Sequence, residues 1–149
     1  MKSGDDIKMT IRAIQKSDYP KIAGLIMNEL GYPEQNCEDI YKRLGFIEKD
    51  NRYHTLVACI DNQVVGFIGL CKIVTYEKGE YINILAFAVA DKYQGQGIGK
   101  ALLASTKTYA CENKIKQIRV SSALHREETH LFYVANGFER TSYAFIMEM

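Results

Sequence analysis

A glycine-rich loop at residues 94–100 is the part of this sequence with the clearest chemical use. It reads Gln94-Gly95-Gln96-Gly97-Ile98-Gly99-Lys100. Glycines permit positive φ and let a ligand approach the backbone closely. An apolar stretch precedes the loop and a helical pattern follows it, and backbone N–H groups at a helix N-terminus bind anions. The loop therefore predicts a site for phosphate or pyrophosphate.

The spacing of the glycines excludes two common phosphate motifs. A P-loop needs four residues between its glycines and then Lys-Ser or Lys-Thr. Here three residues separate Gly95 from Gly99, and Ala101 follows Lys100. A dinucleotide-binding G-x-G-x-x-G motif needs a glycine where Lys100 stands. A turn that only starts a helix is the competing interpretation, which the strand before and the helix after disfavour.

The elements that position this loop follow from the pattern of apolar residues. A mostly apolar strand is predicted at 80–90 and a helix at 98–113. Gly66 and Gly69 mark a possible bulge in the preceding strand. The full set of predicted elements comprises strands at 8–13, 52–60, 64–74, 80–90, 117–121 and 143–148, and helices at 17–30, 36–48, 98–113 and 127–136. This order predicts one α/β (α+β) domain over residues 1–149 with a mixed sheet.

Two segments resemble the GNAT (GCN5-related) N-acetyltransferases. Gln94-x-x-Gly97-x-Gly99 matches the family's Q/R-x-x-G-x-G/A pattern, and 131–138 resembles its F-Y-x-x-x-G-F segment. The order of the predicted elements also matches. The resemblance implies the GNAT fold, with six to seven strands and about four helices.

The resemblance also implies transfer of an acetyl group from acetyl-CoA to an amine by direct attack, without a metal. The CoA pyrophosphate is expected on the loop, and the pantetheine arm on the strand before it, as in β-augmentation. An N–H near Phe87 or Ala88 is expected to stabilise the charge that develops on the thioester oxygen. The residues implied in cofactor binding are Phe87, Ala88, Val89, Gln94, Gly95, Gln96, Gly97, Ile98, Gly99, Lys100, Ser122 and Tyr133.

Tyr133 occupies the family's tyrosine position, which implies a general acid for the departing thiolate. A packed helix tyrosine is the alternative. Some members carry a glutamate six residues before Val89, where this chain has Asn83. Glu80 is the candidate base, acting through water, and Glu77 a less favoured one. Both could equally be solvated carboxylates of a turn, and a neutral amine needs no base.

Several residues near the two motifs have less specific roles implied by the resemblance or by their position. Ser122 stands near a position where many members have Asn. Arg126 could contact a CoA phosphate or simply start a helix, and His125 and His130 lack a third ligand for a metal. Cys111 is predicted to be a packed thiol without a nucleophilic role.

The net charge and the lengths of the apolar stretches indicate which classes of partner are disfavoured. A net charge of +1 without a basic run disfavours nucleic acid, and no stretch is long enough to span a membrane. Residues 1–6 show no signal-peptide pattern, so we expect a cytoplasmic protein with reduced thiols. A small-molecule amine is the expected acceptor and a homodimer is possible.

Two alternatives stay open. One is an acyl-CoA-binding regulatory module without catalysis, suggested by Asn83, and the other is acetylation of protein or peptide amines. Substrate choice is expected at 31–35 with the helix that follows, and at 139–143. The segment 30–33 resembles the start of some aminoglycoside-modifying members.

Overall fold

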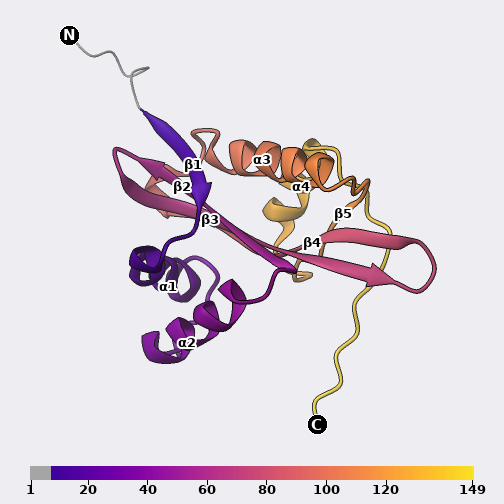
Figure 1. Ribbon diagram of the computed structural model, residues 1–149, viewed down its shortest axis with the longest axis horizontal. Helices are drawn as coiled ribbons and strands as arrows, with labels where there is room; N and C mark the ends of the chain where they lie inside the picture. The colour runs from indigo at the N-terminus through magenta and orange to yellow at the C-terminus, as the bar shows by residue number, and fades with distance from the viewer. Residues whose placement is uncertain (1–7) are drawn as a thin grey trace. The chain divides into compact units, whose positions relative to one another are not determined.

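The computed structural model describes residues 8–149 (Figure 1). The nine main elements are β1 (Met9–Ala13), α1 (Tyr19–Asn28), α2 (Cys37–Glu48), β2 (Tyr53–Ile60), β3 (Gln63–Thr75), β4 (Gly79–Val89), α3 (Ile98–Glu112), β5 (Ile118–Val120) and α4 (Glu127–Ala135). Short 3-10 turns at Lys16–Asp18 and Asp91–Tyr93 precede α1 and the glycine loop. Every predicted element except the last strand is present. The segment 1–6 lies outside the described residues.

The chain forms two compact units, divided between Arg119 and Val120. The sheet has the strand order β1-β2-β3-β4-β5, and the first four strands pair antiparallel. Asp61 and Asn62 both have positive φ, as a tight hairpin between β2 and β3 requires. This is the expected mixed α/β fold, with five strands rather than six to seven.

In the first unit, helices cover both faces of the sheet, with α1 and α2 on one face and α3 on the other (Figure 1). Ile22 and Ala23 of α1 and Ile40 and Leu44 of α2 pack against Val57, Cys59, Phe67 and Ala88. Leu102, Leu103 and Thr106 of α3 are also buried. Because both faces are covered, six consecutive residues of β2, 55–60, are buried.

The helix boundaries follow local chemistry. Asn36 caps α2 by accepting a hydrogen bond from the Asp39 N–H at 2.8 Å. Gly31 has a φ of 83° and follows the end of the α1 segment, where glycine commonly adopts a left-handed conformation. Asp18, buried ahead of α1, forms a salt bridge with Arg12 at 2.7 Å. The Arg12–Asp18 salt bridge also ties the start of α1 to β1 of the sheet.

Two bulges interrupt the ladder close to the predicted glycines. Ala58 pairs with Gly66 and Cys59 with Val64, so Val65 is an extra residue in β3. Gly69 pairs with Ala86 and Leu70 with Ile84, so Leu85 is an extra residue in β4. Bulges bend a strand and redirect its side chains, and they are frequent beside functional sites. The second bulge immediately precedes the strand segment predicted to bind cofactor.

In the second unit, α4 is followed by residues 138–149 without helix or strand. The predicted strand at 143–148 is therefore wrong for the single chain. Its composition favours a strand, but a strand needs a partner for its N–H and C=O groups. Nothing in the described part of the chain pairs with these residues.

Candidate functional site

The glycine loop joins β4 to α3 through a short 3-10 turn. Gly95 and Gly97 have φ values of 78° and 83°, which residues other than glycine rarely adopt. Gly97 is the N-cap of α3 and supplies no side-chain cap. A Cβ atom built on either glycine meets nothing within 4 Å. The loop thus presents an open surface of backbone at the start of a 15-residue helix.

The first N–H groups of α3 are suited to an anion. The earliest backbone bond within the helix joins Ala101 N–H to the Gly97 carbonyl at 3.0 Å, so the N–H groups of Ile98, Gly99 and Lys100 precede it. N–H groups at this end of a helix have no partner within the helix and carry the positive end of its dipole. Lys100 is exposed and adds a full positive charge. These groups can hold a phosphate or pyrophosphate.

The side chains of Gln94 and Gln96 bind backbone carbonyls of the residues that precede the loop. The Gln94 side-chain amide donates to the Val89 carbonyl at 3.0 Å, and the Gln96 amide donates to the Lys92 carbonyl at 3.4 Å. The Asp91 N–H donates to the Glu29 carboxylate at 3.1 Å, which ties the loop to the end of α1. The sequence predicted Gln94 and Gln96 at the site but missed Glu29, because 62 residues separate it from Asp91.

Gly66 lets β3 approach both β4 and the start of α3. A Cβ at this position would lie 3.0 Å from the Ala88 carbonyl oxygen, 3.4 Å from Val89 and 3.5 Å from Ile98. A close backbone approach of this kind requires glycine. Gly66 therefore sets where the loop begins.

Phe87, Ala88 and Val89 lie at the end of β4, beyond the Leu85 bulge. Ala90 N–H donates to the Val65 carbonyl across the β3–β4 ladder at 2.7 Å. Because antiparallel ladders alternate, the N–H of Ala88 also points toward β3, whereas those of Phe87 and Val89 point to the opposite edge. The bond from Gln94 to the Val89 carbonyl agrees with this alternation.

The two candidate bases, Glu80 on β4 and Glu77 in the turn before it, are not beside Phe87. Glu80 is exposed and pairs in register with Val74 near the β3–β4 turn, and Glu77 is exposed in that turn. Asn83 is half-buried and pairs with Cys71. Seven residues separate Glu80 from Phe87, which at strand spacing corresponds to roughly 20 Å.

Tyr133 lies on α4 in the second unit and is 9% exposed. Its ring meets Phe132 and Phe138 edge-on, with centroids 5.7 Å and 5.3 Å away. Burial raises the pKa of the Tyr133 hydroxyl to about 12, although the charge of Arg126 opposes that rise. The hydroxyl therefore keeps its proton at neutral pH.

Other predicted residues of the second unit have local contacts. The Ser122 hydroxyl is buried and has no hydrogen-bond partner among the described residues. The His130 ring contacts the Ala123 carbonyl at 2.8 Å, and Arg126 is the N-cap of α4. No group of three metal-ligating side chains occurs within residues 8–149.

The cysteines differ from the prediction at one position. All four are unpaired thiols, and Cys59 and Cys71 are buried. Cys111 is exposed, so the prediction of a packed thiol is wrong. It faces away from the sheet because Ala110 fills the buried position of this helical turn.

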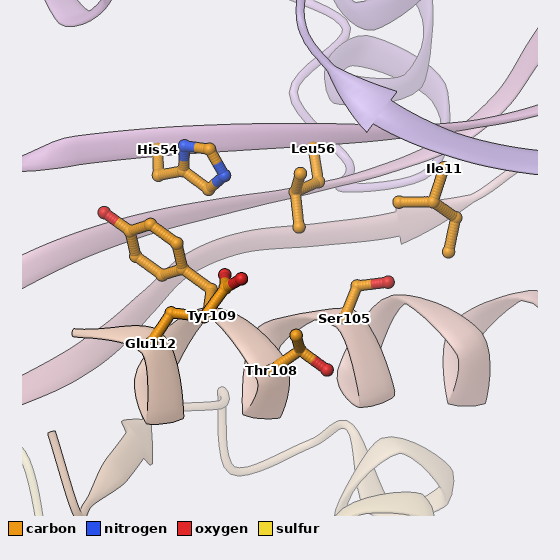
Figure 2. Close-up of a pocket in the computed structure, with 7 residues that line it drawn as sticks. All are labelled: Ile11, His54, Leu56, Ser105, Thr108, Tyr109 and Glu112. Carbon is orange, nitrogen blue, oxygen red and sulfur yellow. The ribbon is translucent and has the colours of Figure 1, made fainter. Parts of the chain in front are cut away.

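A separate pocket of about 200 Å³ lies between α3 and strands β1 and β2 (Figure 2). The His54 ring of β2 stacks on the Tyr109 ring of α3, with centroids 4.1 Å apart and planes 6° apart. Burial, followed by the charge of Lys72, lowers the pKa of His54, although Glu112 opposes this. No local sequence pattern indicates this pocket, because its lining comes from three elements far apart in the chain.

Comparison with known proteins identifies the family. The family model described as an acetyltransferase (GNAT) domain matches residues 51–140. The chain is 29% identical over 132 residues to an aminoalkylphosphonate N-acetyltransferase of Salmonella typhimurium, covering 87% of this chain and 81% of that protein.

Solved structures agree. A GNAT family acetyltransferase of Staphylococcus aureus superposes with a TM-score of 0.79 and 29% identity, covering 96% of this chain and all of that one. The aminoglycoside N-acetyltransferase AAC(6')-Iy in complex with CoA has the same fold, with a TM-score of 0.87 at 15% identity over 99% of this chain and 98% of that one. None of the described helices is long and apolar enough to cross a membrane. Since the family model covers more than half of the sequence, the chain belongs to the GNAT acetyltransferases.

Proposed function

We propose that this protein transfers an acetyl group from acetyl-CoA to a primary amine of a small molecule by direct attack. The observation that carries the proposal is the open glycine loop at the N-terminus of α3, where N–H groups converge without a side-chain cap. Family membership supports the transfer, and the CoA complex of a protein with the same fold supports the cofactor.

The loop would hold the CoA pyrophosphate. Gly95, Gly97 and Gly99 keep the surface free of side chains, and the N–H groups of Gln96, Ile98 and Lys100 lie on the same stretch of backbone. A doubly charged pyrophosphate gains both from these N–H groups and from the helix dipole. Gln94 would act by fixing the loop to the Val89 carbonyl rather than by touching the ligand.

The strand segment 87–89 would hold the amide-rich pantetheine arm by β-augmentation. The ladder directs the N–H of Ala88 toward β3 and that of Phe87 toward the opposite edge of β4, so we prefer Phe87 as the donor. An N–H aimed at the thioester carbonyl stabilises the negative charge that this oxygen gains in the transition state. We assign that role to the Phe87 N–H.

Tyr133 would donate a hydrogen bond to the departing thiolate. A thiol has an ordinary pKa of about 8.5, whereas burial raises the Tyr133 pKa to about 12. Complete proton transfer would thus cost about 5 kcal/mol in the protein without ligand. The hydroxyl is therefore suited to hydrogen bonding first, with proton transfer as the thiolate leaves. The partnerless Ser122 hydroxyl would gain a partner in a bound cofactor amide.

A dedicated base has less support from the geometry. Roughly 20 Å of strand between Glu80 and Phe87 prevents both from touching one amine. Glu80 could therefore act only through a chain of waters. An acceptor amine that reaches the site in its neutral form would need no base.

The relatives and the α1–α2 region both support a small amine as the acceptor. The Salmonella relative is named for aminoalkylphosphonates, which are small amines. Between the end of α1 and the first turn of α2 stand Glu29, Glu34, Glu38 and Asp39. Two of these already have partners, because Glu29 accepts from the Asp91 N–H and Asp39 accepts from the Asn36 amide. Glu34 and Glu38 are exposed and would be the groups that attract a cationic acceptor.

The test is loss of the acetyl-CoA thioester with a panel of amines. The panel should contain an aminoalkylphosphonate, an aminoglycoside, a polyamine, an amino acid and a peptide with a free N-terminus. We expect turnover with at least one small amine and none with the peptide. Turnover with the peptide alone would contradict the assignment. Direct measurement of the thioester avoids a background from the exposed thiols of Cys37 and Cys111.

A further inference from the structure

One arginine of the first unit has no ion-pair partner and no role in the site described so far. Arg119 is the middle residue of β5, the strand that pairs with β4. Its side chain is exposed, and no carboxylate within residues 8–149 forms a salt bridge with it. The function proposed above also leaves undefined the part of the acceptor that lies beyond its amine.

The guanidinium of Arg119 is held at two points. Its Nε–H donates a hydrogen bond to the side-chain oxygen of Gln117 at 2.7 Å. Its central carbon lies 4.1 Å from the centroid of the Tyr81 ring, within the range of a cation–π contact. An arginine that is already ordered loses less entropy when it binds a ligand. The two remaining nitrogens, Nη1 and Nη2, form a planar fork that matches two oxygens of a carboxylate or phosphonate.

The ring beneath this guanidinium belongs to the face of the sheet that α1 and α2 cover. Tyr81 and Asn83 are alternate residues of β4 and share a face. Asn83 pairs with Cys71 of β3. Ala86 pairs with Gly69, two residues from Cys71, so Asn83 and Ala86 share that face despite the bulge between them. Ala86 packs against the core cluster to which α1 and α2 contribute. The guanidinium therefore lies on the same face as the helices whose acidic residues would attract an amine.

The neighbour of Arg119 on this face is an amide. The chain reaches β5 from β4 through the crossover helix α3, so the two strands run parallel. The Ile82 N–H donates to the Gln117 carbonyl at 2.9 Å, and in a parallel ladder this bond places Arg119 beside Asn83. A carboxylate at this position could neutralise the guanidinium, whereas the half-buried amide of Asn83 leaves its charge available to a ligand.

The register gives the span between Arg119 and the reacting segment. Phe87 pairs with Ile68, and Asn83 pairs with Cys71. Three residues of β3 therefore separate the two levels, which corresponds to roughly 10 Å. A hydrogen bond of about 3 Å at the guanidinium leaves roughly 7 Å for the acceptor. With bonds of about 1.5 Å in a zigzag chain, this is roughly five or six bonds between the amine nitrogen and its distant end.

Building on the function proposed above, we propose that Arg119 binds an anionic oxygen group, a carboxylate or phosphonate, at the end of the acceptor remote from its amine. The acceptor is then a zwitterion with its two charges several bonds apart. The amine nitrogen attacks the acetyl carbon and loses one proton, and CoA leaves as the thiol. The acid stays on the guanidinium and takes no part in this bond change.

Paired acceptors test the charge. We compare kcat/KM for ε-aminohexanoate with that for hexylamine, and kcat/KM for aminobutylphosphonate with that for butylamine. Within a pair the amine and the chain are alike, so the ratio of the two values reports the acid. We expect a ratio of about ten or more for at least one pair, and the larger ratio identifies the preferred acid. Glycine and methylamine form the length control, whose ratio should be close to unity because glycine cannot span the distance.

Variants test the residue. Arg119→Gln removes the charge and should lower the acid-to-alkylamine ratio about tenfold. Arg119→Lys keeps the charge but loses the fork, so its ratio should fall between those of the parent and Arg119→Gln. Lys116→Gln is the matched control, because it removes one positive charge from an exposed residue just before the same strand. Its ratio should equal that of the parent. Thermal melting confirms that the variants are folded.

Tyr81 is a positioning residue, which gives a second readout. Tyr81→Leu removes the ring that supports the guanidinium and should raise KM for the acid with little change in kcat. Tyr81→Phe keeps the ring and should recover most of that loss. Equal effects of the two variants would contradict the support of Arg119 by this ring.

The outcomes separate this acceptor class from the acetyl transfer itself. Ratios close to unity for both long pairs, or a ratio that Arg119→Gln leaves unchanged, overturn the anion site while acetylation of amines stands. If no amine is acetylated, the proposed function fails, and ε-aminohexanoate and aminobutylphosphonate are titrated calorimetrically into the protein with excess CoA. Binding of either acid that Arg119→Gln weakens about tenfold supports the site. Absence of binding, or equal binding by the parent and Arg119→Gln, overturns it.

Discussion

The side-chain amide of Gln94 donates a hydrogen bond to the Val89 carbonyl at 3.0 Å, which closes the turn between β4 and the glycine loop. This contact links the two parts of the proposed cofactor site, namely the strand segment for the pantetheine arm and the loop for the pyrophosphate. A side chain in the loop thus determines how the loop leaves the strand.

Gln94→Leu removes this bond while keeping a side chain of similar size. A hydrogen bond of this type contributes about 1 kcal/mol, so we expect acetyl-CoA affinity to fall about fivefold. Calorimetric titration measures the change. Gln96→Leu is the matched control, because its longer contact of 3.4 Å with Lys92 contributes less. Equal losses in both variants would show that the Gln94 bond has no special role.

Gly66→Ala should destabilise the protein. The added methyl would lie 3.0 Å from the Ala88 carbonyl oxygen, which belongs to the backbone and can give way only if β3 and β4 shift apart. Overpacking of this kind costs about 1–3 kcal/mol, seen as a lower urea midpoint. Gly69→Ala is the control, because its nearest neighbour lies at an ordinary 3.7 Å. Comparable loss in the control would mean that these strands disfavour alanine in general.

Asp18→Asn should reveal a pH-dependent contribution to stability. The Arg12 hydrogen bonds hold the pKa of the Asp18 carboxyl below its ordinary 3.8. A carboxyl whose pKa is lower in the folded protein than in the unfolded chain stabilises the fold at pH values above its unfolded-state pKa. This contribution is lost as the pH falls through the folded-state pKa. We expect Asp18→Asn to cost about 2 kcal/mol at pH 7 and progressively less below pH 4. A penalty that stays constant between pH 7 and pH 3 would contradict this.

Tyr133→Phe tests the role of the hydroxyl. The packing against Phe132 and Phe138 needs only the ring, so the fold and cofactor affinity should change little. Loss of proton donation should lower kcat by roughly 100-fold. Tyr76→Phe, at a fully exposed tyrosine, is the control and should leave kcat unchanged. An unaffected Tyr133→Phe enzyme at saturating substrates would show that chemistry does not depend on this hydroxyl or does not limit the rate.

Local signals were sufficient to predict much of the fold. The Asn36 cap, the positive φ of Gly31 and the boundaries of α3 follow from residues close in sequence. The Leu85 bulge could not be placed, because the register of β4 depends on how β3 pairs with it. The strand predicted at 143–148 failed for a related reason: its composition is suitable, but pairing depends on a partner that composition does not supply.

In the candidate site, too, some features have a local sequence pattern and others depend on contacts between distant residues. The glycine loop was recognisable because the proposed anion site is made of backbone, and glycine spacing reflects such a site directly. The contact from Glu29 to the Asp91 N–H and the stack of His54 on Tyr109 join distant parts of the chain and leave no local pattern. The candidate base Glu80 could be named from the sequence, but only the strand geometry showed how far Glu80 lies from Phe87.

The most direct test of the cofactor site is calorimetric titration of acetyl-CoA into the parent protein, Gly97→Asp and Gly79→Asp. Both glycines have positive φ and open space around them, so the two variants carry the same backbone strain and charge. Only Gly97 lies in the proposed pyrophosphate loop. We predict one-to-one binding by the parent and by Gly79→Asp, and at least a tenfold loss in Gly97→Asp, since a carboxylate would repel the pyrophosphate. Unchanged affinity in Gly97→Asp, or no binding by the parent protein, would contradict the assignment.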